Sequence, residues 1–149
     1  MKKLKNTIII FISVTVLSGC ASSIYDHYTF TETLNTKAKA EHLVQKSNTP
    51  YSDNISLVDD LKVQLQTMVT YERAKDKNQI TLKMWEYLNR DNSALHQFLN
   101  TWENQGTMST AFVQQFSPQI SKAFDLMIDY ENKKSKASGN AITSFLSNL

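Results

Sequence analysis

One side chain in this sequence stands where it could take part in covalent chemistry. Cys20 is the only cysteine among the 149 residues, and the small residues Ser18 and Gly19 precede it directly, after the branched Leu17. A thiol is a strong nucleophile for forming a thioether, and small residues before it leave the backbone accessible to a peptidase. A single cysteine cannot form an internal disulfide, so the Cys20 thiol is available for another reaction.

The residues before Cys20 have the pattern of an export signal. Lys2, Lys3 and Lys5 form a positive start without any acidic residue, and an apolar run of ten residues from Ile8 to Leu17 follows. A positive segment ahead of about 7–15 apolar residues is typical of a signal peptide. The run is about half of the roughly 20 residues that a membrane-spanning helix needs. We therefore predict that residues 1–19 form an export signal.

The segment Leu17-Ser18-Gly19-Cys20 resembles the lipobox of bacterial lipoproteins. In that family the cysteine sulfur carries lipid, the signal is cut just before it, and the new amino terminus is often acylated. The resemblance implies a covalent lipid on Cys20, with no other cofactor, and a membrane anchor in the cell envelope. Two or more acyl chains give a stable anchor. Ala21 stands where many Gram-negative lipoproteins retained at the inner membrane have Asp, which favours the outer membrane, facing the periplasm, in such an organism.

The composition of the mature region favours one helical domain. Loss of residues 1–19 removes three lysines and no acidic residue, so the net charge changes from +2 to −1, which does not indicate a nucleic-acid surface. The remaining 130 residues suit a single domain. Their two glycines and two prolines are too few for a β-sandwich or barrel. No glycine-rich phosphate loop and no internal repeat are recognised.

The first half of the mature region predicts a tether at residues 20–26 and then helices. A helical pattern covers residues 27–46, and a turn covers 47–52. One line along this helix is formed by Phe30, Leu34, Lys37, Glu41 and Val44, with Tyr28, Ala38 and Leu43 nearby. The next helix, with Ser52 or Asp53 as N-cap, has the clearest stripe, formed by Ile55, Val58, Leu61, Leu65, Met68, Val69 and Glu72. A helix over 79–89 is either separate from it or continuous with it.

The second half predicts two further helices and a tail. Asp91 or Asn92 is the N-cap of the first, which ends at Gly106, and Ser109 caps the second. The second carries the stripe Phe112, Phe116, Ile120, Phe124, Met127, Ile128 and Glu131. Pro118 either kinks this helix or, behind Ser117, begins a new one. We predict an all-α single bundle of four to six amphipathic helices over residues 27–131, followed by a polar linker and a short apolar tail at 132–149.

Other residues with catalytic or metal-binding side chains do not form a known pattern. His27, His42 and His96 lack the spacing of a zinc site, so no metal is predicted. Asp125 and Asp129 share one helix face and could act as an acid–base pair. Lys122 and Lys133 lie three and four residues from them, however, which favours a neutralised, solvated face. No Gly-x-Ser-x-Gly motif occurs, so we predict no catalytic residue.

Aromatic residues are concentrated in the second half of the chain. Most are expected in the core, but Trp85, Trp102, Phe112 and Phe116 are candidates for an interface or for lining an apolar ligand site. Trp102 lies near a helix end, where a tryptophan can be half-exposed.

The mature region is also similar to small helical bacterial lipoproteins without an established activity. The similarity rests on Tyr25 and Tyr28, on Trp85, and on the Trp102-Glu103-x-x-Gly106 helix end. It implies a helical fold and no particular reaction.

Three functions are open on these grounds. The first is a lipid-anchored envelope module that binds another envelope protein and has no catalytic site. The second is a binder of a lipid or other hydrophobic small ligand, which requires an apolar cavity of roughly several hundred Å³ within the bundle. The third is a hydrolase, which requires Asp, Glu or His side chains that converge in a cleft.

Overall fold

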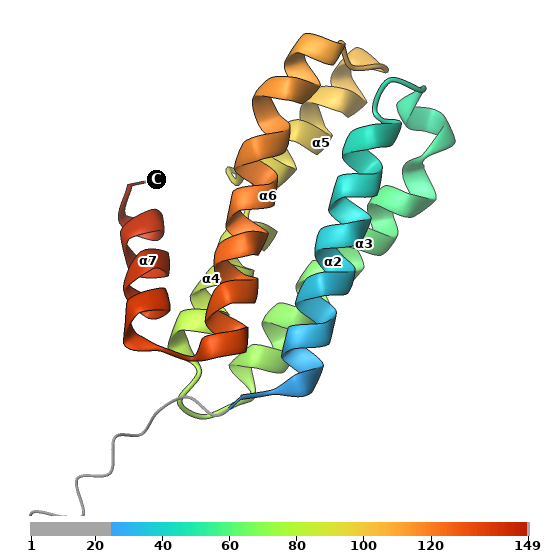
Figure 1. The fold of residues 1–149 in the computed structure, drawn as a ribbon. Coiled ribbons are helices and arrows are strands. Elements are labelled where there is room, and N and C mark those ends of the chain that lie inside the picture. The colour runs from blue at the N-terminus through green and yellow to red at the C-terminus, as the bar shows by residue number, and fades with distance from the viewer. Residues whose placement is uncertain (1–24, 149) are drawn as a thin grey trace, which may run out of the picture.

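The computed structural model describes residues 25–148. The predicted export signal, with Leu17, Ser18, Gly19 and Cys20, therefore lies outside the described residues. The described chain is all-α, as predicted, and none of its helices is both long and apolar enough to span a membrane. Its elements (Figure 1) are α2 (His27–Lys46), the 3₁₀ turn η1 (Tyr51–Asp53), α3 (Ile55–Arg73), α4 (Gln79–Asn89), α5 (Ala94–Gln105), α6 (Thr110–Lys133) and α7 (Lys136–Ser147).

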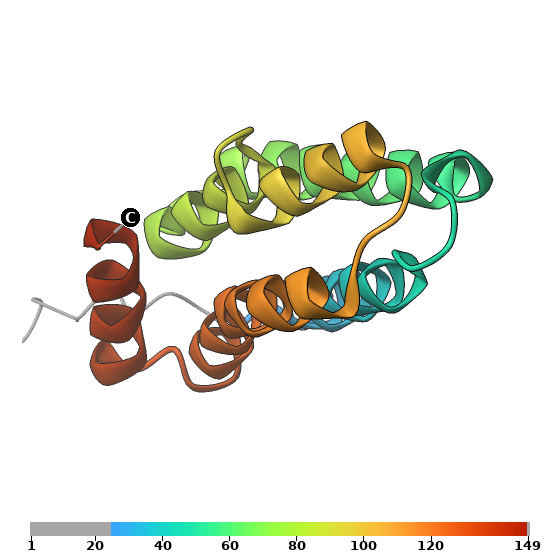
Figure 2. The same cartoon turned by 90° about the horizontal axis from the view of Figure 1, so that it is seen from above.

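The helices form a bundle of two layers. Figure 2 shows α3 with α4 and α5 in one layer and α2 with α6 in the other, while α7 lies against α6 and α4 at one end. The start of α2, the end of α3 and the α6–α7 junction meet at that same end (Figure 1), which we call the basal end. The α2–α3 and α5–α6 connections meet at the opposite, distal end.

The stripe predicted for α3 forms the centre of the core. Val58, Leu61, Leu65, Met68 and Val69 are all buried, whereas Ile55 at the start of the stripe is 46 % exposed. The largest side chains that pack around them are Trp85, Phe98, Trp102 and Phe124. The period of three and four residues thus predicted the buried face of this helix correctly.

The face of α2 that enters the core differs from the prediction. Val44 and the neighbouring Leu43 are buried as predicted, but Leu34 is 41 % exposed. The rest of the buried line is formed by Thr29, Thr33, Thr36 and Ala40. The hydroxyl groups of Thr33 and Thr36 donate to the backbone oxygens of Thr29 and Glu32, each at 2.7 Å. A threonine whose hydroxyl donates to its own helix backbone can be buried at small cost. The buried face of α2 therefore contains threonines that a count of apolar residues does not predict.

The helix ends agree in part with the predicted caps. Ser109 caps α6 through its hydroxyl, which accepts from the Phe112 backbone N–H, and Gly106 ends α5 with a φ of 77°. Two predicted N-caps are wrong by one or two residues. Asn54 precedes α3 in place of Ser52 or Asp53, and Ser93 caps α5 in place of Asp91 or Asn92.

Two alternatives about helix continuity are resolved by the backbone. α3 and α4 are separate helices, and Lys77 in the turn between them has a φ of 60°. α6 continues through Pro118, whose exposed position keeps the missing backbone hydrogen bond on the solvent side. A new helix capped by Ser117 is therefore not formed.

The predicted linker and tail at 132–149 are wrong for most of their length. Residues Lys136–Ser147 form α7, which Ser135 caps through its hydroxyl. Ile142 is buried, and Gly139 lies so close to Ile80 that an added Cβ would come within 3.1 Å of the isoleucine Cδ1. The bundle domain therefore extends beyond residue 131. Its first helix begins at His27 and ends at Lys46, as predicted, and Asp26 directly before it is the N-cap.

The burial of Ile142 predicts that α7 contributes to the stability of the whole bundle. We expect Ile142→Ala to lower the free energy of unfolding by about 2–4 kcal/mol, because it removes buried methyl groups and leaves a cavity. Ile55→Ala is the matched control and should cost about 0.5 kcal/mol or less, because Ile55 is 46 % exposed. Urea unfolding followed by circular dichroism measures both. Equal effects of the two substitutions would contradict the docking of α7.

Candidate functional site

The two tryptophans predicted as interface candidates are core residues. Trp85 and Trp102 are both fully buried, so the expectation that Trp102 is half-exposed is wrong. The indole N–H of Trp102 donates to the backbone oxygen of Thr49 at 3.1 Å, and the Tyr51 ring meets the indole edge-on. The segment around Thr49 and Tyr51 therefore covers Trp102, and sequence spacing within α5 could not reveal this long-range contact.

The two phenylalanines of the prediction lie together and remain partly buried. The rings of Phe112 and Phe116 stack at 4.5 Å with an interplanar angle of 16°. Both rings also lie 6.3 Å from the buried ring of Phe98. They belong mainly to the α5–α6 packing, and their outer edges stay candidates for an apolar contact.

A hollow of about 410 Å³ lies at the distal end. Its walls come from the η1 region and from the end of α5, which are joined by a hydrogen bond from the Tyr51 backbone N–H to the Gly106 oxygen at 2.7 Å. Ile55 contributes an exposed apolar side chain and Glu103 an exposed carboxylate. The lining of the hollow therefore combines apolar side chains with the carboxylate of Glu103.

The distal end is acidic over a wider area. Burial raises the pKa of Tyr51, and the nearby carboxylates of Glu103 and Asp59 raise it further. Residues 46–60 and 103–110, which form this end, contain four acidic residues and a single lysine: Asp53, Asp59, Asp60 and Glu103 against Lys46. A ligand that presents an apolar group beside positive charge fits this end best.

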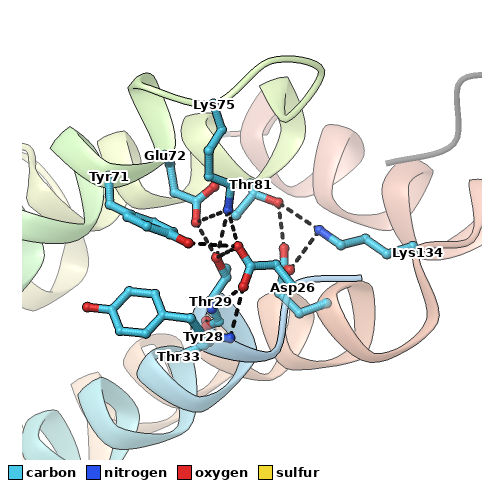
Figure 3. Close-up of polar contacts among 10 residues, drawn as sticks. Asp26, Tyr28, Thr29, Thr33, Tyr71, Glu72, Lys75, Thr81 and Lys134 are labelled. Atoms are coloured by element: carbon cyan, nitrogen blue, oxygen red, sulfur yellow. Dashed lines mark hydrogen bonds and ion pairs between the residues drawn. The ribbon is translucent and has the colours of Figure 1, made fainter. Parts of the chain in front are cut away.

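The basal end contains a buried polar cluster that sequence analysis did not predict (Figure 3). Lys75 uses all three of its N–H donors there, with Nζ at 2.7 Å from Asp26 Oδ2, 2.9 Å from Thr29 Oγ1 and 2.9 Å from Glu72 Oε1. The Thr29 hydroxyl makes a short hydrogen bond to Glu72, and the Tyr71 hydroxyl donates to Asp26 at 3.0 Å. These contacts join the start of α2 to the end of α3.

A second cluster repeats this arrangement between α4 and α6. The Thr81 hydroxyl donates to Glu131 Oε1 at 2.5 Å, and Lys134 Nζ lies 2.7 Å from the other oxygen of the Glu131 carboxylate. In each cluster the lysine also lies over a tyrosine ring of its own helix end, Lys75 over Tyr71 at 4.5 Å and Lys134 over Tyr130 at 4.7 Å. Both glutamates are fully buried or nearly so.

The two clusters correspond to a repeated sequence motif. Tyr71-Glu72-x-x-Lys75 ends α3 and Tyr130-Glu131-x-x-Lys134 ends α6, and an Asp or Asn three residues before a threonine begins the partner helix in each case. Each copy spans only five residues, so the motif marks two helix ends and is not a repeated structural unit. A glutamate at the end of an apolar stripe, followed by lysine at i+3, was the signal that could have revealed both clusters.

The electrostatics of the first cluster differ between its two acids. Burial alone would raise the pKa of Asp26, but hydrogen bonds from Lys75, the Thr29 backbone and Tyr71 hold it well below its ordinary value. Burial raises the pKa of Glu72, which Thr29 and Lys75 offset only in part, and the negative charge of Glu131 raises it further. Because Glu72 and Glu131 are closed to solvent, neither offers a carboxylate for acid–base chemistry on a bound substrate.

The other predicted candidates for chemistry are dispersed. Asp125 pairs with Lys37 of α2 at 2.5 Å instead of with the expected Lys122, while Asp129 pairs with Lys133 as expected. His96 is buried, and desolvation lowers its pKa. Within residues 25–148, no group of three or more His, Cys, Asp and Glu side chains is placed to hold a metal ion.

Comparison with protein-family models, with curated proteins and with solved structures finds no match to this chain.

The lowered pKa of Asp26 predicts a pH-dependent contribution to stability. The folded state favours the ionised form, so the contribution is fully present above about pH 3.8, the ordinary value, and is lost as the pH falls toward the lowered pKa. We expect Asp26→Asn, which keeps a good N-cap, to lower the free energy of unfolding by about 1–3 kcal/mol at pH 7 through loss of charge-assisted hydrogen bonds. Urea unfolding between pH 2.5 and 7 measures this (roughly the range in which carboxylates titrate).

The control for this substitution is Asp53→Asn, which changes an exposed acid at the distal end and should leave stability almost unchanged. The difference between the wild type and Asp26→Asn should shrink below about pH 3.8. A constant difference across the whole pH range would show that the charge of Asp26 is not responsible.

Proposed function

We propose that this chain is a lipid-anchored cell-envelope protein whose helical bundle binds another envelope protein. The observation that carries the proposal is the position of Cys20, which follows an export-signal pattern and precedes Tyr25, the first residue of the described bundle, by only five residues. A lipid on Cys20 would hold the bundle beside the membrane without any spanning helix. In a Gram-negative organism Ala21 favours the periplasmic face of the outer membrane.

The distal hollow is the surface we propose for the protein partner. The hollow lies at the opposite end of the bundle from the start of α2 (Figure 1). A lipid on Cys20 inserted in the membrane would therefore leave the hollow accessible. Ile55 provides an apolar contact, and Glu103 with the neighbouring aspartates provides negative charge. The complementary partner surface is an apolar side chain flanked by lysine or arginine.

An apolar ligand within the bundle is a weaker alternative. Large side chains, among them Trp85, Phe98, Trp102 and Phe124, fill the space between the layers. A hollow of about 230 Å³ between α4 and α7 has apolar walls from Ile80, Ile142 and Leu146, but it is smaller than the roughly 300–1,000 Å³ typical of ligand pockets. We therefore favour protein binding and propose no catalytic role.

The proposed anchor predicts the behaviour of a Cys20→Ala variant. Without the thiol no thioether can form, so we expect loss of palmitate labelling and release of the protein from the membrane fraction. Ser22→Ala, two residues away, is the control and should be labelled like the wild type. Labelling and fractionation of intact cells measure both properties. Undiminished labelling of Cys20→Ala would refute the anchor.

The proposed binding surface predicts a position-specific cross-link. A photoreactive residue in place of Ile55, in the lipidated protein in intact cells, should form an adduct with one envelope protein. The same residue in place of Val63, which is 66 % exposed on α3, is the control and should not form it. Glu103→Lys should reduce the adduct from position 55 several-fold by reversing the charge in the lining of the hollow. Equal adducts from both positions, or none from position 55, would contradict the proposal.

A further inference from the structure

The connections at the basal end are rich in positive charge. The α3–α4 and α6–α7 connections, residues 73–78 and 132–137, together carry six basic residues and a single acidic one. Lys75 and Lys134 are neutralised within the two polar clusters. The exposed basic residues are Arg73, Lys77, Lys133 and Lys136, with Asp76 as the only acid in the two segments.

Two of these four exposed basic residues have acidic partners, and two have none among the described residues. Arg73 pairs with Glu86 and Lys133 with Asp129, and both acids lie farther along their helices, away from the connections. Lys77 and Lys136 make no ion pair with any residue in the range 25–148. Lys77 and Lys136 are therefore exposed cations without an ion-pair partner among the described residues, one in each basal connection. The distal end, by contrast, carries four acids and one lysine in residues 46–60 and 103–110.

Exposed aromatic side chains accompany this positive charge. Tyr25 is 49 % exposed and Tyr28 is 46 % exposed, and both lie at the start of α2. The Tyr28 ring packs edge-on against Tyr71 at 4.8 Å, beside the last turn of α3. Tyrosine is enriched where one end of a side chain meets apolar chains and the other meets water, as at the surface of a bilayer.

The covalent path limits how far this end could move from an anchored lipid. Four residues lie between Cys20 and Tyr25, and the five Cα–Cα steps correspond to at most about 18 Å of extended chain. The 24 residues of α6 run from the distal to the basal end, a length of about 36 Å. The acidic end would thus lie several screening lengths from the membrane, because the Debye length is about 8–10 Å at moderate salt.

We propose that the basal end is a docking face for an anionic lipid surface, formed by Lys77, Lys133 and Lys136 with the exposed rings of Tyr25 and Tyr28. This inference rests on the proposed anchor at Cys20. The lipid headgroups supply negative charge to the lysines, and the tyrosines enter the headgroup layer. The bundle then stands end-on, with its acidic end and the distal hollow directed away from the membrane. The two polar clusters lie at the ends of α3 and α6, where the two basic connections begin.

Hydrogen–deuterium exchange of the lipidated full-length product in vesicles tests the docking face. Vesicles of phosphatidylcholine with about one-third phosphatidylglycerol, which give a negative surface, are compared with vesicles of phosphatidylcholine alone. We expect several-fold slower exchange in residues 73–78 and 132–137 on the anionic vesicles only. The slowing should disappear at about 0.5 M salt, where charges are screened within a few ångström. The triple variant Lys77→Gln, Lys133→Gln and Lys136→Gln should reduce the ratio of docked to undocked protein on the order of 100-fold.

The matched control is Lys39→Gln, Lys83→Gln and Lys122→Gln, which removes the same charge from exposed positions on the sides of the bundle and should keep the wild-type protection. Equal exchange on both kinds of vesicle, or protection that survives in the basal triple variant, would overturn the docking face. The mass of the Cys20 peptide from the same samples reports lipidation separately. A bare peptide refutes the anchor itself, whereas a lipidated peptide without selective protection refutes only the docking face.

Discussion

Two buried carboxylates determine how the helices of this bundle can be paired. A glutamate taken out of water is costly unless it keeps its hydrogen-bond and charge partners. Glu72 and Glu131 each obtain a lysine from their own helix end and a threonine hydroxyl from the first turn of another helix. If one helix of either pair moved along the other by one turn, about 5.4 Å, the threonine hydroxyl would no longer reach the glutamate. The buried carboxylate would then lack one of its hydrogen-bond donors. The two clusters therefore set the register of α2 against α3 and of α4 against α6.

The apolar core fills space but is less selective about register. Aliphatic stripes accept many relative positions when total volume is kept, and α3 and α6 present such stripes. α2 differs, because its buried line consists largely of threonine and alanine. These small side chains form the surface that α2 presents to the α3 and α6 stripes, and the hydroxyls of Thr33 and Thr36 are satisfied within the helix itself. Packing thus supplies most of the stability, while the basal clusters select the arrangement.

The features that were predicted correctly depend on residues close together in the sequence, and features that depend on residues far apart were not predicted. The α3 stripe, the Ser109 cap and the Gly106 helix end depend on nearby residues, and all were predicted. The buried face of α2 was missed because threonine was counted as polar, and α7 was missed because Lys136 to Asn140 has few apolar residues. The basal clusters depend on pairs 43 and 50 residues apart, although the repeated Tyr-Glu-x-x-Lys motif marked their positions. The burial of Trp102 under Tyr51 left no local signal.

The place where the chain enters the bundle is also the place where polar contacts are most dense. Any pull from a lipid on Cys20 would reach the fold at Asp26, which binds the backbone N–H groups of Tyr28 and Thr29 and the side chains of Lys75 and Tyr71. Helix ends are ordinarily the first parts of a fold to open. Opening the first turn of α2 would lengthen the tether by several residues, and it would also break the Thr29–Glu72 bond and leave a buried carboxylate short of a donor. The free-energy cost of leaving Glu72 without this donor would oppose unwinding of α2 and so would keep the proposed tether short. A short tether would in turn keep the exposed basal lysines close to the membrane.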